Sequence, residues 1–143
     1  MKTIHRAARM ALGATAGLAL ALSGTTPASA ATWELRDFQQ RICVTSSSGH
    51  PGTYFVAAVV GSWSTTVQIA LQNLPPGVTS MGGTPIPPGS NYPKNGSTTI
   101  NGFVQISIPP LPVGEYTPLL TASDSTETQS VPVTISVKQQ SCY

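Results

Sequence analysis

Hydrophobic and polar residues alternate most clearly near the C-terminal end of the chain. Val131, Val133, Ile135 and Val137 alternate there with Pro132, Thr134, Ser136 and Lys138. A period of two is typical of a strand with one buried face. We therefore expect Val133 and Ile135 to be buried, and Thr134 and Ser136 to face outward.

The longer segment Pro112–Lys138 predicts a β-hairpin. Its first half places Tyr116, Leu120 and Ala122 on one face, and a polar run over 123–130 leads into the alternating second half. Polar clusters between two apolar segments are typical of turns. The rest of the chain is interpreted as the remainder of a β-sandwich that includes this hairpin.

Earlier stretches that predict strands are Ala31–Asp37, Arg41–Thr45, Thr53–Val60, Thr65–Leu74 and Thr98–Ile108. Thr53–Val60 is apolar on both faces, which suits a central strand covered on both sides. A buried helix gives the same pattern, but the β-branched and aromatic content favours a strand. In the last stretch we expect Ile100 and Val104 to face inward and Gly102 to mark a bulge.

Pro75–Ser97 interrupts the alternation with repeated proline and glycine. Strand ladders tolerate few prolines, so the segment predicts a long loop with at most a short edge strand near Thr79–Met81. Asn95-Gly96 predicts a tight turn within it. Long loops in compact domains often bind partners, whereas the alternative is a spacer that covers a sheet edge.

Three pieces of the chain, Val67–Val78, Pro112–Thr117 and Val131–Val137, resemble segments of bacterial immunoglobulin-like and fibronectin-like domains. The resemblance implies an all-β fold, an immunoglobulin-like antiparallel two-sheet sandwich of six to eight short strands. It also implies that the Tyr116 hydroxyl reaches a backbone group near the preceding corner. Residues 31–143 further resemble a family of small secreted actinobacterial proteins of unknown function, which supplies no activity.

The first 30 residues have the three parts of a secretory signal peptide. Lys2, Arg6 and Arg9 precede the apolar run 10–22, and 28–30 read Ala-Ser-Ala. We therefore expect cleavage before Ala31, a secreted protein, and one β-sandwich domain over 31–143. The apolar run is shorter than the ~20 residues that a spanning helix needs, so no membrane span is expected.

Removal of this segment changes the charge. The chain has seven Lys and Arg against five Asp and Glu, and three of the seven lie in the first 30 residues, so four remain against five. A net charge of −1 leaves no basic patch for nucleic acid or an acidic membrane.

The two cysteines, Cys43 and Cys142, predict a disulfide, because secreted chains meet an oxidising environment. With His50 as the one histidine after residue 30, they do not make a zinc site, and no metal or cofactor is expected. Asp124 and Glu127 could contribute to a calcium site, although two carboxylates in one polar turn are more often solvated.

Catalytic motifs are missing from the sequence. There is no Gly-x-Ser-x-Gly, and His50 lies in a Ser-Gly-His-Pro-Gly turn. A hydrolase triad of His50, a serine and Asp37 or Asp124 is recognised by geometry, which the sequence does not give. We therefore expect a protein that is not an enzyme.

Four residues are candidates for binding: Trp63, Ile86, Tyr92 and Phe103. Trp63 lies at a strand end and is expected to be partly exposed, while Phe103 lies on the otherwise polar face of its strand. Ile86 and Tyr92 belong to the proline-rich segment. The alternative is that most of these side chains fill the core or cover its edge, because single exposed apolar residues are common.

Together these features predict a secreted, monomeric, non-catalytic protein that acts by binding, on the cell surface or in the medium. Its expected ligand is a cell-surface component, a polysaccharide or an extracellular protein. The alternative is a secreted inhibitor of an extracellular hydrolase that presents the proline-rich loop 75–97.

Overall fold

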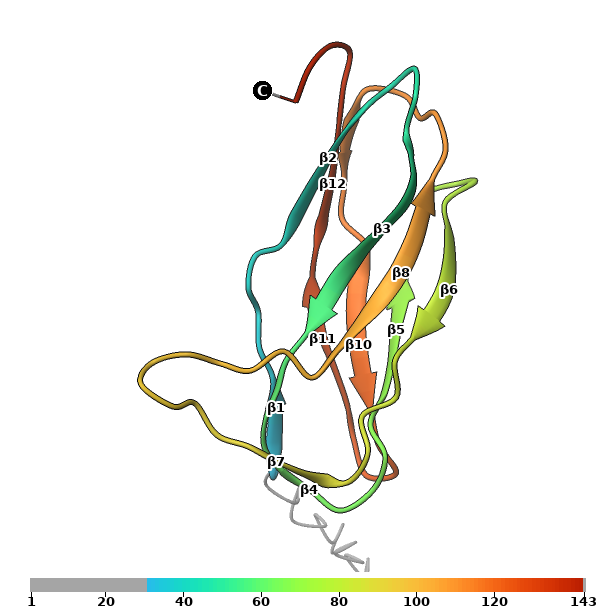
Figure 1. The fold of residues 1–143 in the computed structure, drawn as a ribbon. Coiled ribbons are helices and arrows are strands. Elements are labelled where there is room, and N and C mark those ends of the chain that lie inside the picture. Colours follow the sequence, from blue (N-terminus) through green and yellow to red (C-terminus); the bar gives the residue numbers. More distant parts are fainter. Residues whose placement is uncertain (1–30, 143) are drawn as a thin grey trace, which may run out of the picture.

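The computed structural model describes residues 31–142, which form strands and connecting segments only (Figure 1). The expected signal peptide, residues 1–30, and Tyr143 lie outside the described residues. Across 31–142 no helix is long and apolar enough to cross a membrane. The all-β prediction is confirmed.

The described residues form twelve strands: β1 Trp33–Leu35, β2 Arg41–Thr45, β3 His50–Ala57, β4 Val59–Trp63, β5 Gln68–Gln72, β6 Thr79–Gly83, β7 Gly89–Asn91, β8 Gly102–Ile108, β9 Gly114–Tyr116, β10 Leu119–Ser123, β11 Thr128–Pro132 and β12 Thr134–Lys138. The expected count of six to eight was too low. Several predicted strands are divided by a short break, as β3 and β4 are at Ala58.

The strands form four sheets of three, in the orders β1-β4-β7, β3-β8-β6, β11-β10-β5 and β2-β12-β9. Every pair is antiparallel except β2 with β12, which is parallel, so the expectation of wholly antiparallel pairing was wrong. Because β3 leads into β4, and β11 into β12, neighbouring sheets are joined by nearly continuous strands (Figure 1).

The C-terminal hairpin forms as predicted, with a bend in both arms. β10 pairs with β11, and β9 pairs with β12. Between the two pairs, the Val133 backbone N–H donates to the Pro118 carbonyl oxygen at 3.0 Å. The predicted strand over 131–137 therefore divides at Val133 and serves two sheets.

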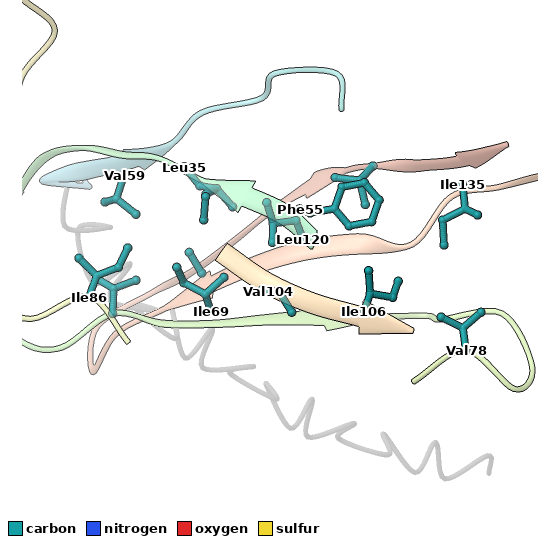
Figure 2. Close-up of a cluster of buried hydrophobic side chains, with 14 of the residues drawn as sticks. Leu35, Phe55, Val59, Ile69, Val78, Ile86, Val104, Ile106, Leu120 and Ile135 are labelled. Carbon is teal, nitrogen blue, oxygen red and sulfur yellow. The ribbon is translucent and has the colours of Figure 1, made fainter. Parts of the chain in front are cut away.

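One apolar core lies between the layers of strands. Figure 2 shows Phe55, Val104, Ile106, Leu120 and Ile135 within it, and all five side chains are buried. These residues come from three of the four sheets, so the core holds the sheets together. Burial of each large side chain stabilises the fold by roughly 1.5–3 kcal/mol.

The face assignment of β12 is correct for its apolar residues and wrong for Ser136. Val133 and Ile135 are buried, and Thr134 is half-buried. Ser136 is fully buried, because it lies between Cys43 of β2 and Glu115 of β9 in register. Its hydroxyl donates to Glu115 Oε1 at 2.7 Å, which satisfies the buried polar group.

Two predicted interactions, a hydrogen bond of Tyr116 and a disulfide, are confirmed. The Tyr116 hydroxyl donates to the Pro112 carbonyl oxygen at 2.9 Å. Cys43 and Cys142 form a disulfide across a sequence separation of 99 residues. In the chain-entropy model such a long closed loop stabilises the fold by roughly 4–5 kcal/mol.

Gly102 begins β8 instead of forming a bulge. The register irregularities lie elsewhere, between His50 and Thr53 and between Ser80 and Gly83. A Cβ at Gly102 would lie 3.0 Å from Ile69 Cδ1 and 3.1 Å from the Thr84 carbonyl oxygen. A side chain at this position would press against both groups, so the glycine favours close packing here.

Candidate functional site

The outer face of the β3-β8-β6 sheet carries apolar side chains. Phe55 of β3 and Val104 of β8 point into the core, so the residues beside them point outward. In register, Tyr54 lies opposite Gln105 and Val56 lies opposite Phe103. Three of these four outward side chains are apolar or aromatic.

Tyr54 and Phe103 contact each other on this face. Their ring centroids are 5.9 Å apart and their planes make an angle of 61°, an edge-to-face arrangement. Tyr54 is 59% exposed and Phe103 is 42% exposed. The contact orients both rings while leaving large parts of each available to a partner.

Tyr54 lines two depressions on this face. The larger, about 490 Å³, is lined by Tyr54, Val56, Ile100, Phe103 and Gln105. The smaller, about 240 Å³, is lined by Pro51, Gly52, Thr53, Tyr54, Met81, Gln105, Ile106 and Ser107. We call Tyr54, Val56, Met81, Ile100 and Phe103 the apolar face. The residues that line the two depressions include no charged side chain.

Of the apolar face, sequence reasoning identified Phe103 as a binding candidate and missed the other four residues. Thr53–Val60 was expected to be covered on both sides, which was wrong, because nothing in 31–142 covers Tyr54 fully. Ile100 was expected to face the core, but it precedes β8 and is exposed. Apolar residues on both faces of Thr53–Val60 were the available signal.

Two of the predicted binding candidates are buried. Trp63 is 5% exposed, and its indole N–H donates to the Pro87 carbonyl oxygen at 2.8 Å. Ile86 is buried and forms a backbone bridge with Val67, with both hydrogen bonds at 2.9 Å. The expectation that Trp63 is partly exposed was wrong, because β4 pairs with β7 and the Pro87 carbonyl covers the indole.

The proline-rich segment 75–97 is only partly a loop. The short edge strand expected near Thr79–Met81 is present as β6, whereas β7 was not expected. Ile86 anchors the chain between these two strands. The projecting part is the connection between β7 and β8, residues 92–101, drawn in gold in Figure 1. We call it the 92–101 loop.

The tip of the 92–101 loop is the predicted tight turn. Lys94 and Ser97 exchange backbone hydrogen bonds of 3.1 and 3.0 Å. Asn95 and Gly96 between them have φ of 53° and 74°, values that favour these two residue types. Tyr92, before the tip, is 62% exposed.

An open pocket of about 440 Å³ lies between this loop and β7. It is lined by Ser90, Asn91, Tyr92, Lys94, Thr99 and Asn101. The Asn91 amide nitrogen donates to the Thr99 carbonyl oxygen at 3.0 Å and to Asn101 Oδ1 at 2.8 Å. We call it the loop cavity.

The β2-β12-β9 sheet carries charged side chains on its surface, in contrast to the apolar face. Glu115 accepts hydrogen bonds from Ser136 and Arg41, and Lys138 Nζ lies 3.7 Å from the same carboxylate oxygen. The hydrogen bond from Ser136, followed by the charges of Arg41 and Lys138, lowers the pKa of Glu115. We call Arg41, Glu115 and Lys138 the charged cluster.

Asp124 stabilises the turn between β10 and β11. Its Oδ1 accepts from the Thr126 hydroxyl, the Thr126 N–H and the Glu127 N–H, and its Oδ2 accepts from the Trp33 indole at 3.0 Å. These bonds, led by that of the Thr126 hydroxyl, lower the pKa of Asp124 to about 2. Within 31–142, no group of three or more His, Cys, Asp or Glu is placed to hold a metal ion.

Comparison with known proteins gives one match. The model of a family of unknown function, DUF5980, matches residues 34–140. No curated protein and no solved structure matches the chain.

Proposed function

The chain belongs to the DUF5980 family, whose description assigns no activity, and we propose that it is a secreted, non-catalytic protein that binds another extracellular protein through the apolar face. The observation that carries this proposal is the gathering of five exposed or half-buried apolar side chains around two depressions without a charged lining residue. Single exposed apolar residues are ordinary, whereas contiguous apolar patches often mark interaction sites.

The chemistry of the face favours an apolar protein surface as its occupant. The ring planes of Tyr54 and Phe103 are inclined by 61°, so the two rings do not form one flat surface. Gln105 is the one amide among the residues of the larger depression, so most hydroxyl groups of a glycan would lose water without a replacement partner. Phosphate groups would find no cation there.

An apolar side chain of a protein partner fits the same site well. Placed in either depression, it would lose contact with water and gain contact with Tyr54, which lines both. Aromatic residues and methionine are enriched at protein interfaces, and Met81 is 80% exposed beside the smaller depression. The rest of the face would then exclude water around these anchors.

We also propose that the strands form two layers in an immunoglobulin-like order. We place β1, β3 with β4, β8 and β6 in one layer, and β5, β9 with β10, β11 with β12, and β2 in the other. The continuity of the bent strands supports this immunoglobulin-like order. The hydrogen bond from Tyr116 to Pro112 also supports it, because related sandwiches have such a bond at the same corner. Secretion is supported by the disulfide and by the expected signal peptide.

The inhibitor alternative has less support. Of its loop 75–97, β6, β7 and the buried Ile86 are built into the fold, so only the part from Tyr92 onward projects. That part closes into a tight turn at 94–97. Inhibition of an extracellular protease by the purified protein, lost on replacement of Lys94, would favour the inhibitor over our proposal.

Site-specific photo-crosslinking tests the proposal. A photoreactive residue at position 103 should crosslink to one extracellular protein in the medium or on the cell surface, and excess unlabelled protein should compete. The matched control places the same residue at Gln72, exposed on β5 in the other layer. Equal products from both positions, no product from position 103, or a second copy of this chain as the product would each refute the proposal.

A further inference from the structure

We propose that the loop cavity is a second site, separate from the apolar face, and that it binds a neutral saccharide. Its six lining residues combine two amides, two hydroxyl side chains, one exposed aromatic ring and one amine. This mixture differs from that of the apolar face. The inference stands apart from the proposed protein docking and requires a different ligand.

The two amides of the cavity are held in fixed orientations. Thr99 contributes a carbonyl oxygen, which only accepts, so Asn91 must turn its NH₂ group toward it. Val59 contributes a backbone N–H, which only donates, so Asn101 must turn its Oδ1 toward it, at 3.0 Å. The bond of 2.8 Å between the two side chains then locks them together.

This arrangement leaves one acceptor and one donor for a ligand. Among the hydrogen bonds of residues 31–142, none uses Asn91 Oδ1 or Asn101 Nδ2. A sugar hydroxyl both donates and accepts, so neighbouring hydroxyl groups of one ring can bond to both amides. Ser90 and Thr99 also line the cavity, and each carries a side-chain hydroxyl group. Because the amides are already oriented, little conformational entropy is lost when they bind.

Tyr92 supplies the apolar part of the site. It is 62% exposed and lines the cavity beside the amides. A pyranose ring has an apolar face of C–H groups, and an aromatic ring covers such a face without losing hydrogen bonds. Pockets that combine an aromatic surface with a few convergent polar groups are typical of small-molecule sites.

The charge of the cavity favours a neutral ligand over an acidic one. Of the six lining residues Lys94 is the one with a charge, and it lies on the exposed turn of the loop. A sulfated or phosphorylated polymer would need several cations in fixed positions. The saccharide could be a soluble oligosaccharide or part of an insoluble polysaccharide, and the chemistry of recognition is the same for both.

Calorimetric titration tests the site directly. Neutral oligosaccharides of glucose, mannose and N-acetylglucosamine are titrated into the wild-type protein, and cosedimentation with the corresponding insoluble polymers is measured in parallel. At least one sugar should bind. Binding to the soluble chains and binding to the polymer alone both support the site, and they distinguish the two sources of ligand.

Matched variants locate the binding within the molecule. Tyr92→Ala should weaken the sugar affinity about tenfold or more, equivalent to about 1.4 kcal/mol. Tyr92→Phe keeps the ring and should stay within about threefold of wild type. Tyr54→Ala, outside the loop cavity, should bind sugar as wild type does. Unchanged melting temperatures verify that the variants are folded.

Several results would overturn the inference. They are the absence of binding to every sugar tested and an unaffected Tyr92→Ala variant. Loss of sugar binding in Tyr54→Ala would show that the two sites are one. Failure of the crosslink at position 103 with intact sugar binding would refute the proposed function alone.

Discussion

The two outer faces of the molecule differ in chemistry although one alternating pattern underlies both. On β3 and β8, Tyr54, Val56 and Phe103 face outward. On β2, β9 and β12, the outward residues include the charged cluster, where Glu115 contacts both Arg41 and Lys138. The sheets on both sides bury apolar residues, such as Phe55 of β3 and Ile135 of β12. The difference therefore lies in the outward positions, where the fold tolerates many residue types and where binding chemistry can reside.

The largest difference in loss of stability is expected between substitutions of two adjacent residues of β3. Phe55→Ala removes a side chain that is 1% exposed and should lower the free energy of unfolding by about 3–5 kcal/mol. Tyr54→Ala should cost only about 1 kcal/mol, mainly through its contact with Phe103. Urea melts of both variants measure this difference. A Tyr54→Ala variant as unstable as Phe55→Ala would mean that the apolar face is covered by the protein itself.

A buried residue and its outward neighbour can be compared in the same way on β12. Ile135→Ala should cost roughly 2–5 kcal/mol, because Ile135 is completely buried. Thr134→Ala should cost within about 1 kcal/mol, the range of strand propensities. Denaturant unfolding of the two variants gives the comparison. Equal losses would show that the faces of β12 are assigned wrongly.

A smaller effect is expected at the corner before β9. Tyr116→Phe removes the hydrogen bond to the Pro112 carbonyl oxygen and should cost about 1 kcal/mol. Because the phenylalanine ring still packs against the core, the change in stability reports the loss of the hydrogen bond alone. Unchanged stability of Tyr116→Phe in thermal and urea melts would argue against a structural role for this bond.

The smallest predicted effect appears only in acid. Hydrogen bonds lower the pKa of Asp124 to about 2 from its ordinary value of 3.8. A lowered pKa means that Asp124 contributes stability above about pH 3.8, and this contribution is lost as the pH falls toward 2. Asp124→Asn should therefore lose less stability than wild type over this interval, in urea melts at several pH values. Parallel curves for the two proteins would contradict this origin of the acid sensitivity.

Local sequence patterns predicted which residues are buried better than they predicted which surfaces stay exposed. The alternation at Val133 and Ile135 correctly predicts burial, and Asn95-Gly96 correctly predicts a turn. The bend at Val133 does not follow from the pattern, because it depends on which strands pair on each side. Likewise, an apolar strand such as Thr53–Val60 has the same sequence pattern whether its second face is covered by other residues or exposed to solvent.

The surroundings of the candidate binding residues were harder to predict, because they depend on which separate segments of the chain pair with one another. Ile86 lies among prolines, and its burial depends on the bridge with Val67. Trp63 becomes buried where β7 pairs with β4. The amides of Asn91 and Asn101 meet only because the loop between β7 and β8 closes on itself. No local sequence signal marks any of these contacts.

The most direct test of the account is the affinity for the protein that crosslinks at position 103. Binding of this purified partner is measured by calorimetry for wild type, Phe103→Ser and the control Gln72→Ala. The account predicts that Phe103→Ser weakens binding at least about tenfold, as expected of an interface anchor worth more than about 1.4 kcal/mol, while Gln72→Ala binds as wild type does. Equal affinities for wild type and Phe103→Ser would contradict the claim that the apolar face binds a protein.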